Sequence, residues 1–266
     1  MDLSIIIVNY KTKELLLSCL DAIYDHRPMP LNFEVTVVDN ASCDGSVEAL
    51  NSRFSHVKLI VNGDNLGLAK AINQGLRVSR GRYVLLLSPD IIFSSQVFIK
   101  MVEFMDTHPE AGAISPLLLD PDKAARPLYG RFPTLFSHFS RLLGIRQLIP
   151  DFLGKRCRMK IDTSCDFISM DWLMSACLMF KSEVLKKAGD LDENFFFYFE
   201  DMEFTRRLKD QGWKLYLIPK LPVIHIQHQG IKLMPLGARN TLFRKSCSYF
   251  YYKRWFLRKK HCNIKG

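Results

Sequence analysis

Two adjacent carboxylates, Glu200 and Asp201, follow directly on a run of five aromatic residues at positions 195–199. Phe204 and Leu208 come next at a spacing that places them on one face of a helix, so the pattern predicts a helix that begins at the acidic pair. The dipole at a helix N-terminus favours the charged form of a carboxylate, whereas apolar neighbours raise its pKa. A charged and poorly solvated carboxylate is suited to remove a proton as a general base. A helix cap beside core aromatics is the alternative interpretation of this stretch.

Polar side chains follow four predicted strands, each at the point where the strand ends. The strands are expected over residues 3–8, 33–38, 57–61 and 83–87, and the residues selected after them are Asn9, Tyr10, Asp39, Asn65 and Asp90, together with Gly67, which adds only its backbone. The carboxyl ends of parallel strands meet at one edge of a sheet, which is where ligands bind in open α/β folds. The sequence therefore predicts a ligand crevice at this edge.

The elements that position these side chains alternate between strands and helices. Helical patterns separate the four strands, and this β-α-β-α-β-α-β order predicts an α/β fold with a mainly parallel, doubly wound sheet. No Gly-x-Gly-x-x-Gly follows the first strand and no Gly-x-x-x-x-Gly-Lys-Ser/Thr occurs, which disfavours the common dinucleotide and P-loop sites. Tyr10 can instead stack on a base, and Asp39 can accept a hydrogen bond from a pyrimidine ring N–H.

Four ordered motifs in the first ninety residues give the chain a family resemblance. They are VNY at residues 8–10, VDNASCDGS at 38–46, NLGLAKAINQG at 65–75 and LSPD at 87–90. Together they resemble the inverting glycosyltransferases of family 2, which have the GT-A fold, and within that family the rhamnosyltransferase-like branch that builds bacterial cell-surface polysaccharides. The resemblance implies a nucleotide-sugar site. In such a site the base of the nucleotide sugar would be contacted by Asn9, Tyr10 and Asp39. The ribose and diphosphate of the nucleotide sugar would lie near Asn65, Gly67, Asn73 and Ser88.

The resemblance also implies a divalent cation, Mg²⁺ or Mn²⁺. Asp90 corresponds to the last carboxylate of the family's Asp-x-Asp metal motif, although Ser88 stands at the first position of that motif here. With one carboxylate, the ion would take its remaining ligands from the diphosphate and from water. The family places a histidine near this ion, and we favour His225 over His228 for that position. Two further strands are expected, one over residues 214–218 and one over residues 223–226, and the second contains His225.

The acceptor side of the site is expected in the second half of the chain. Trp172 and Ser175 lie in a stretch that resembles the family's Asp-Trp and small-residue pattern, and the resemblance implies that they contact the acceptor. Trp172 can stack on a sugar face, with filling of the core as its alternative role. Asp201 is implied as the catalytic base, and Glu200 is expected to help orient the acceptor.

Length and composition place the chain among globular proteins with a sizeable core, with 266 residues of which 48% are hydrophobic. We expect a GT-A domain over residues 1–230, with a nucleotide-sugar-binding half (1–115) and an acceptor and catalytic half (116–230), followed by a basic amphipathic extension (231–266). Prolines interrupt residues 120–162. This segment could be a lid over the site, a surface that binds the acceptor, or a surface loop without a role in the site. From the acidic Asp2 and the short apolar run after it we expect no secretory signal, and the seven scattered cysteines indicate a reducing cytoplasm.

The basic charge of the chain is concentrated in its last part. Residues 1–210 carry 25 basic and 27 acidic side chains, whereas twelve Lys and Arg and no Asp or Glu follow Asp210. Aromatic residues alternate with these cations, a composition typical of an interfacial membrane helix. We therefore expect the extension to bind an anionic membrane surface rather than nucleic acid, and the protein to lie in the cytoplasm at the inner face of a bacterial cell membrane. An oligomer contact, such as a homodimer, is the alternative.

These observations predict an inverting glycosyltransferase. It would move a sugar, L-rhamnose from dTDP-rhamnose or the sugar of a UDP donor, onto a lipid-linked or growing cell-surface glycan. Two alternatives remain open, a sugar-nucleotide nucleotidyltransferase and a non-catalytic peripheral membrane-binding protein. The nucleotidyltransferases have a similar sheet, but they usually carry a Gly-rich basic loop after the first strand, which this sequence lacks.

Overall fold

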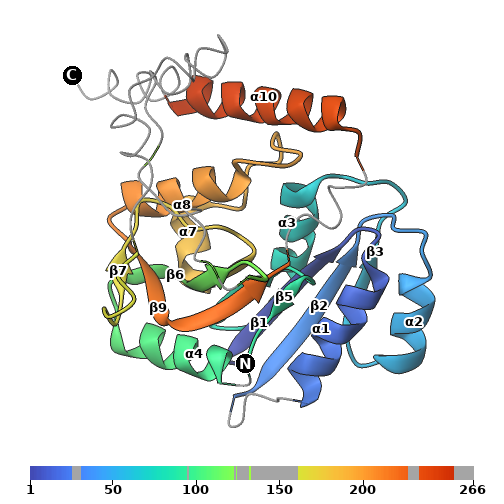
Figure 1. Ribbon diagram of the computed structural model, residues 1–266, viewed down its shortest axis with the longest axis horizontal. Helices are drawn as coiled ribbons and strands as arrows, with labels where there is room; N and C mark the ends of the chain where they lie inside the picture. The colour runs from blue at the N-terminus through green and yellow to red at the C-terminus, as the bar shows by residue number, and fades with distance from the viewer. Residues whose placement is uncertain are drawn as a thin grey trace.

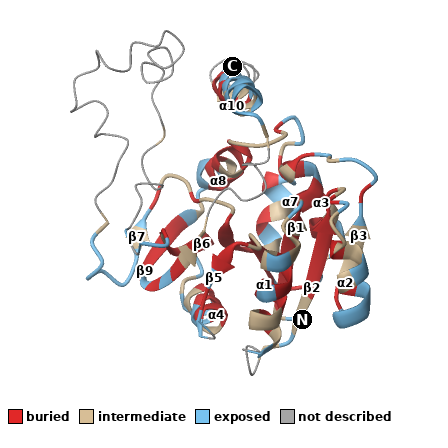
Figure 2. Ribbon diagram, turned by 45° about the vertical axis from the view of Figure 1, so that its right-hand side comes forward, coloured by how far each residue is buried: buried red, intermediate tan, exposed pale blue. Residues whose placement is uncertain are grey.

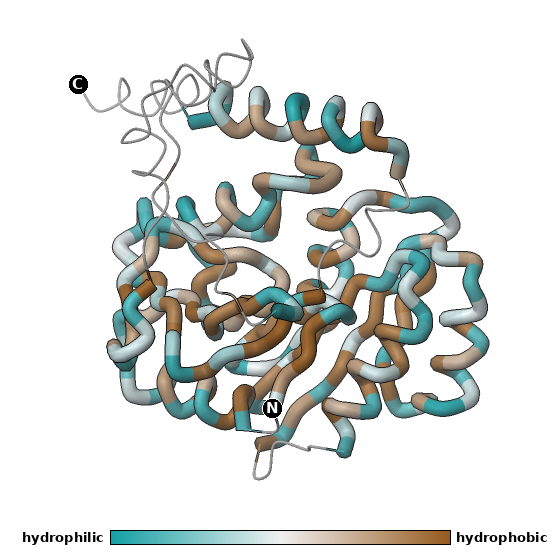
Figure 3. Tube along the Cα trace, viewed as in Figure 1, coloured by the Kyte–Doolittle hydropathy of each residue, from teal (hydrophilic) through white to brown (hydrophobic). Residues whose placement is uncertain are grey.

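The structure, a computed structural model, describes residues 1–25, 31–94, 96–122, 124, 132, 161–226 and 234–254. His228, most of residues 120–162 and the end of the expected extension after residue 254 lie outside the described residues. Hydrophobic residues concentrate along the central strands (Figure 3), and these strands are also where buried residues gather (Figure 2). The sheet therefore forms the core against which the helices pack.

The first half of the chain forms four parallel strands joined by helices, as the sequence predicts (Figure 1). The strands are β1 (Leu3–Asn9), β2 (Phe33–Asp39), β3 (Lys58–Val61) and β4 (Tyr83–Leu87), and the helices are α1 (Lys13–Asp25), α2 (Ser46–Arg53) and α3 (Leu68–Val78). β1 lies between β2 and β4 and is almost completely buried, as its run of β-branched residues requires. This order brings the ends of β1, β2 and β4 to one edge of the sheet.

The second half extends the same sheet with strands of both directions. It contributes β5 (Ile91–Ile92), α4 (Val97–Thr107), β6 (Ala111–Leu119), β7 (Ile168–Ser169), β8 (Cys177–Lys181), the 3₁₀ turn η2 (Ser182–Val184), α7 (Leu185–Ala188), α8 (Glu200–Asp210) and β9 (Lys214–His225). The strand order is β3-β2-β1-β4-β8-β6-β9-β5, with β8 antiparallel to both of its neighbours. The boundary that we expected between residues 115 and 116 falls inside β6, so one sheet runs through both halves.

The two strands expected over residues 214–218 and 223–226 are a single strand, β9. Its pairing with β6 shifts register between Pro116 and Leu117, where Ile218 and then Pro222 are the partners, so the residues between them bulge out of the ladder. Proline cannot donate to a ladder, and a bulge is where a strand can accommodate it. β9 therefore continues past its prolines and delivers His225 to the edge where β4 ends.

The last described helix, α10 (Leu236–Tyr252), lies above α8 on the side of the molecule where β1 and β2 end (Figures 1 and 2). The aromatic side chains on one face of α10, among them Phe250 and Tyr251, are buried against the protein's own residues 195–202. That face of α10 is therefore covered by the protein itself, and binding of the extension to an anionic membrane surface stays a prediction. None of the helices within the described ranges is long and apolar enough to cross a bilayer.

Candidate active site

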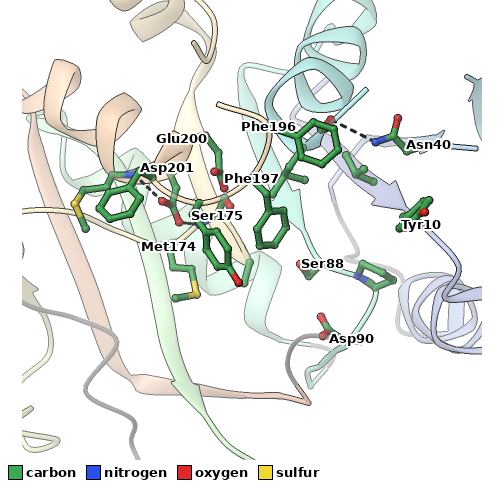
Figure 4. A pocket seen from close by; sticks show the side chains of 18 of the residues that line it. Tyr10, Asn40, Ser88, Asp90, Met174, Ser175, Phe196, Phe197, Glu200 and Asp201 are labelled. Carbon is green, nitrogen blue, oxygen red and sulfur yellow. Dashed lines mark hydrogen bonds between the residues drawn. The ribbon is translucent and has the colours of Figure 1, made fainter. Parts of the chain in front are cut away.

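A cavity of about 410 Å³ lies at the carboxyl edge of the sheet, between the strand ends and the start of α8. It brings together most of the residues that the sequence analysis selected from separate parts of the chain. These are Tyr10, Asn65, Gly67, Ser88, Asp90, Trp172, Ser175, Glu200, Asp201 and His225. Figure 4 shows the acidic pair on one side of this cavity and Tyr10 and Asp90 on the other, with Phe197 between them.

Asp201 sits in the first turn of α8 and is held by two backbone donors. Its Oδ1 accepts a hydrogen bond from its neighbour Met202 N at 2.7 Å, and its Oδ2 accepts one from Ser175 N at 3.2 Å. Burial nevertheless raises the pKa of Asp201 to about 6, against the lowering effect of these donors. Asp201 is therefore charged at neutral pH and basic enough to accept a proton.

Glu200, the other member of the pair, is almost completely buried. Its side chain is 3% exposed, and its Oε2 has no hydrogen-bond partner within the described part of the chain. Burial, and then the neighbouring Asp201 charge, raise the pKa of Glu200 well above its ordinary value. A protonated Glu200 can donate a hydrogen bond into the cavity, whereas Asp201 can accept one.

The segment 195–199, which we call the aromatic wall, turns sharply just before the acidic pair. Tyr198 and Phe199 both have positive φ angles, 71° and 69°. Left-handed backbone costs about 1–2 kcal/mol for each residue other than glycine, so contacts elsewhere must hold this turn. One such contact is the hydrogen bond from Leu68 N, at the start of α3, to the carbonyl of Phe196 at 2.7 Å.

The opposite side of the cavity holds the candidate metal ligands, Asp90 and His225. Their side chains meet with His225 Nε2 3.3 Å from an Asp90 oxygen, and Ile226 N donates to the Asp90 carbonyl at 3.0 Å. His225 is 8% exposed, and its Nδ1 has no partner among the described residues. A carboxylate and an imidazole fit a divalent cation. Within the described ranges no three His, Cys, Asp or Glu side chains gather around one point.

Three of the predicted donor-site residues, Asn9, Asp39 and Asn73, do not line the cavity. The amide nitrogen of Asn9 lies within hydrogen-bond distance of Asp39 Oδ1, at 2.8 Å, and of the hydroxyls of Ser42 in the turn after β2 and Ser46 at the start of α2. Asn73 donates to the carbonyl of Leu191 at 2.9 Å and accepts from its N–H at 3.0 Å. Their polar atoms bind other parts of the protein, and all three side chains are buried. In this structure the three side chains therefore bind the protein itself, and their contacts with a donor stay a prediction.

Two polar residues of the lining, Thr12 and Asn40, and several apolar ones were not predicted from the sequence. Asn40 faces the cavity and donates to Asn65 Oδ1 at 2.8 Å; its place in the VDNASCDGS motif was the signal available for it. Phe243 reaches the cavity from α10, more than forty residues beyond the acidic pair, where no local pattern indicates it. The other apolar lining residues that were missed include Met174, Phe196, Phe197, Tyr198 and Met234.

Comparison with known proteins identifies sequence relatives. The sequence model described as "Glycosyl transferase family 2" matches residues 4–169. The chain is similar to the N-acetylglucosaminyl-diphospho-decaprenol L-rhamnosyltransferase of Mycobacterium tuberculosis, with 26% identity over 208 residues that cover 72% of this chain and 66% of that enzyme. It is 24% identical over 236 residues to the dTDP-rhamnosyl transferase RfbF of Shigella flexneri, which covers 86% of this chain and 72% of that enzyme. The match thus spans about two thirds of the mycobacterial enzyme's length.

Solved structures share the fold of this chain. GalNAc-T7, crystallised with UDP, GalNAc and Mn²⁺, superimposes with a TM-score of 0.63 and 16% identity, covering 86% of this chain and 45% of that one. The mannosyltransferase PcManGT from Pyrobaculum calidifontis, in complex with GDP-Man and Mn²⁺, gives a TM-score of 0.57 and 18% identity, covering 85% and 57%. These likenesses confirm the GT-A fold that the motifs predict.

Proposed function

The chain belongs to glycosyl transferase family 2, and on this premise we propose that it transfers a sugar from a nucleoside diphosphate to an acceptor hydroxyl with inversion. The observation that carries the proposal is the cavity itself. A carboxylate suited to act as a base, Asp201, and a candidate metal pair, Asp90 and His225, open onto the same space. An inverting transfer needs a base for the attacking hydroxyl and a stabiliser for the departing diphosphate, and this cavity offers residues for both.

The proposed donor is dTDP-L-rhamnose, with a UDP-sugar as the alternative, and the proposed acceptor is a lipid-linked or growing glycan. Support for rhamnose comes from the names of the mycobacterial and Shigella relatives. Support for a large acceptor comes from the apolar side of the cavity, where Trp172, Met174 and Phe243 offer surface for a sugar face or an apolar chain.

In the proposed mechanism, Asp201 accepts the proton of the acceptor hydroxyl as that oxygen attacks the anomeric carbon. The two backbone donors from Ser175 and Met202 fix the carboxylate, and its raised pKa strengthens it as a base. Burial raises the pKa of Glu200, and in its protonated form Glu200 donates a hydrogen bond that orients the acceptor beside Asp201. Tyr10 stacks on the base of the donor, as its position on the lining allows.

Asp90 and His225 would hold a Mg²⁺ or Mn²⁺ ion on the donor side. Such an ion would supply positive charge next to the departing diphosphate. Asp90 and His225 reach the cavity edge from adjacent strand ends, and the pairing of Ile91 with His225 holds the two backbones together. The fixed positions of Asp90 and His225 would therefore determine where the diphosphate of the donor binds.

We also propose that the protein works at the inner face of a cell membrane. Arg244 and Lys245 lie on the exposed face of α10, and the net positive charge of the whole chain, +10, comes from the residues after Asp210. Because the aromatic face of α10 is covered, attraction between these cations and anionic lipid headgroups is the binding force that we propose. Such binding weakens as the salt concentration rises.

Thermal-shift titration with dTDP, UDP, GDP and CMP, each with and without Mn²⁺, tests the class of donor. We expect dTDP or UDP to raise the melting temperature, and Mn²⁺ to increase that shift. A transfer assay with dTDP-L-rhamnose and N-acetylglucosaminyl-diphospho-decaprenol then tests the reaction. If none of the four nucleotides raises the melting temperature, the proposal is refuted and a binding protein is favoured. If the protein releases diphosphate from a nucleoside triphosphate and a sugar phosphate, the proposal is refuted and a nucleotidyltransferase is favoured.

A further inference from the structure

The helix α10 contacts the aromatic wall at the residues that turn into the acidic pair. The Phe243 ring lies 5.3 Å, between ring centroids, from both Tyr198 and Phe199, and the Phe250 ring lies 5.5 Å from Phe199. The buried hydroxyl of Ser246 donates a hydrogen bond to the carbonyl of Phe197 at 2.8 Å. α10 therefore holds both the side chains and the backbone of the wall.

The part of the wall that α10 holds is its strained part. Tyr198 and Phe199, the two residues with left-handed backbone, are the ones whose rings contact Phe243. A left-handed pair of aromatic residues persists only where the surroundings fix it. Glu200 follows at once, and Glu203 N donates to the Phe199 carbonyl at 2.9 Å, so the first turn of α8 is built on this strained pair.

A second set of contacts, from Tyr249 and Lys253 at the C-terminal end of α10, fixes this helix against the rest of the fold. Lys253 Nζ lies 2.7 Å from an Asp192 oxygen and 2.7 Å from an oxygen of Glu203, which is completely buried. The Tyr249 hydroxyl donates to Asp192 at 3.0 Å. Asp192 precedes the wall and Glu203 lies on α8, so α10 is tied to the chain on both sides of Tyr198 and Phe199.

We propose that α10 is a functional part of the active site, and that Ser246 and Phe243 are positioning residues for the acidic pair. They keep Tyr198 and Phe199 in the left-handed turn and so set the direction in which Asp201 faces the cavity. Phe243 in addition forms part of the cavity lining. The catalytic part of this inference rests on the proposed sugar transfer by Asp201.

The test compares Ser246→Ala with Ser248→Ala in the full chain. Ser248 lies on the exposed face of the same helix, so its substitution changes helix composition without touching the wall. Amide hydrogen exchange of residues 197–204 is measured first, because it needs no substrate. We expect exchange about fivefold to tenfold faster in Ser246→Ala, the effect of losing one buried hydrogen bond, and unchanged exchange in Ser248→Ala. Equal exchange in the two variants would overturn the inference.

Turnover of dTDP-L-rhamnose with the same lipid-linked acceptor is measured second, at the same concentration of folded protein. Ser246→Ala should lower kcat by about fivefold to tenfold with little change in KM for the donor, since the loss acts on orientation rather than on donor binding. Ser246→Thr, which keeps the hydroxyl, should restore most of the slow amide exchange and most of kcat. Phe243→Leu should resemble Ser246→Ala in both measurements. Faster exchange with wild-type kcat would overturn the positioning role. Failure of the wild type itself to transfer sugar would instead refute the proposed function.

Discussion

Replacing Gly67 by alanine tests how closely α3 approaches the aromatic wall. Gly67 has φ 86° and ψ 167°, a conformation that is essentially restricted to glycine. A Cβ built there would lie 2.7 Å from the carbonyl oxygen of Phe196 and 2.9 Å from its Cα. That same carbonyl accepts the hydrogen bond from Leu68 N at 2.7 Å, so the wall cannot retreat without losing it.

The expected loss of stability in Gly67→Ala is the sum of a backbone cost and a packing cost. The backbone conformation costs a non-glycine residue about 1–3 kcal/mol. Displacing the wall adds about 1–3 kcal/mol, the usual effect of forcing extra atoms into a packed site. We therefore expect Gly67→Ala to lower the free energy of unfolding by about 3 kcal/mol, which for a domain of this size lowers the melting temperature by roughly 6–12 °C.

Urea unfolding at pH 7.5, followed by far-ultraviolet circular dichroism, measures this difference. Gly63→Ala is the matched control, because no atom lies within 4 Å of a Cβ built at Gly63 and its φ is not in the left-handed range. We expect Gly63→Ala to remain within about 0.5 kcal/mol of the wild type, as is usual for surface substitutions. If both variants unfold at the same urea concentration, the close contact between Gly67 and Phe196 does not exist and our description of the cavity wall is refuted.

Three further predictions concern the charged groups. Because the pKa of Asp201 is raised to about 6 and the base must be unprotonated, kcat should fall below pH 6, by about tenfold at pH 5; a profile flat down to pH 4.5 would contradict this. Lys253→Met should destabilise the protein by about 1–3 kcal/mol at pH 7, whereas the exposed Lys245→Met should not; equal urea midpoints would show that the contacts of Lys253 contribute nothing. Burial raises the pKa of Asp192, but hydrogen bonds from Lys253 and Asn194 outweigh it and hold the pKa at about 2, below its unfolded value, so this stabilisation is present above about pH 4 and is lost as the pH falls towards 2. Asp90→Asn should abolish the Mn²⁺-dependent part of dTDP binding in calorimetry and leave the metal-independent part; an unchanged response to Mn²⁺ would remove Asp90 from the metal site.

Much of the fold could be predicted because its signals are local. The strands β1, β2, β3 and β4 appear in the sequence as short apolar runs, and each ends at polar residues that the parallel arrangement brings to one edge. The acidic pair could be found for the same reason, since Phe204 and Leu208 mark the helix that it opens. Continuation of β9 past Pro219 and Pro222 was missed, because a bulge depends on the partner strand and not on the residues themselves.

The parts of the site that could not be predicted depend on long-range packing. Nothing in the spacing of Asn9 and Asp39 shows that they bond to each other and to the turn after β2 instead of facing the cavity. Aromatic residues have no preference for positive φ, so the turn at Tyr198 and Phe199 leaves no mark in the sequence. The contribution of Phe243 to the cavity arises only once α10 packs on the wall.

The role of Asp201 as the base is tested most directly by measuring sugar transfer and nucleotide binding side by side in Asp201→Asn. Asparagine keeps the size of the side chain and an oxygen for one of the backbone donors, but it cannot accept the proton of the acceptor hydroxyl. We predict that dTDP binding with Mn²⁺ remains within about twofold of the wild type while transfer falls by at least about 10²-fold, the usual contribution of a general base. Wild-type turnover in this variant would contradict the assignment of Asp201 and the mechanism built on it.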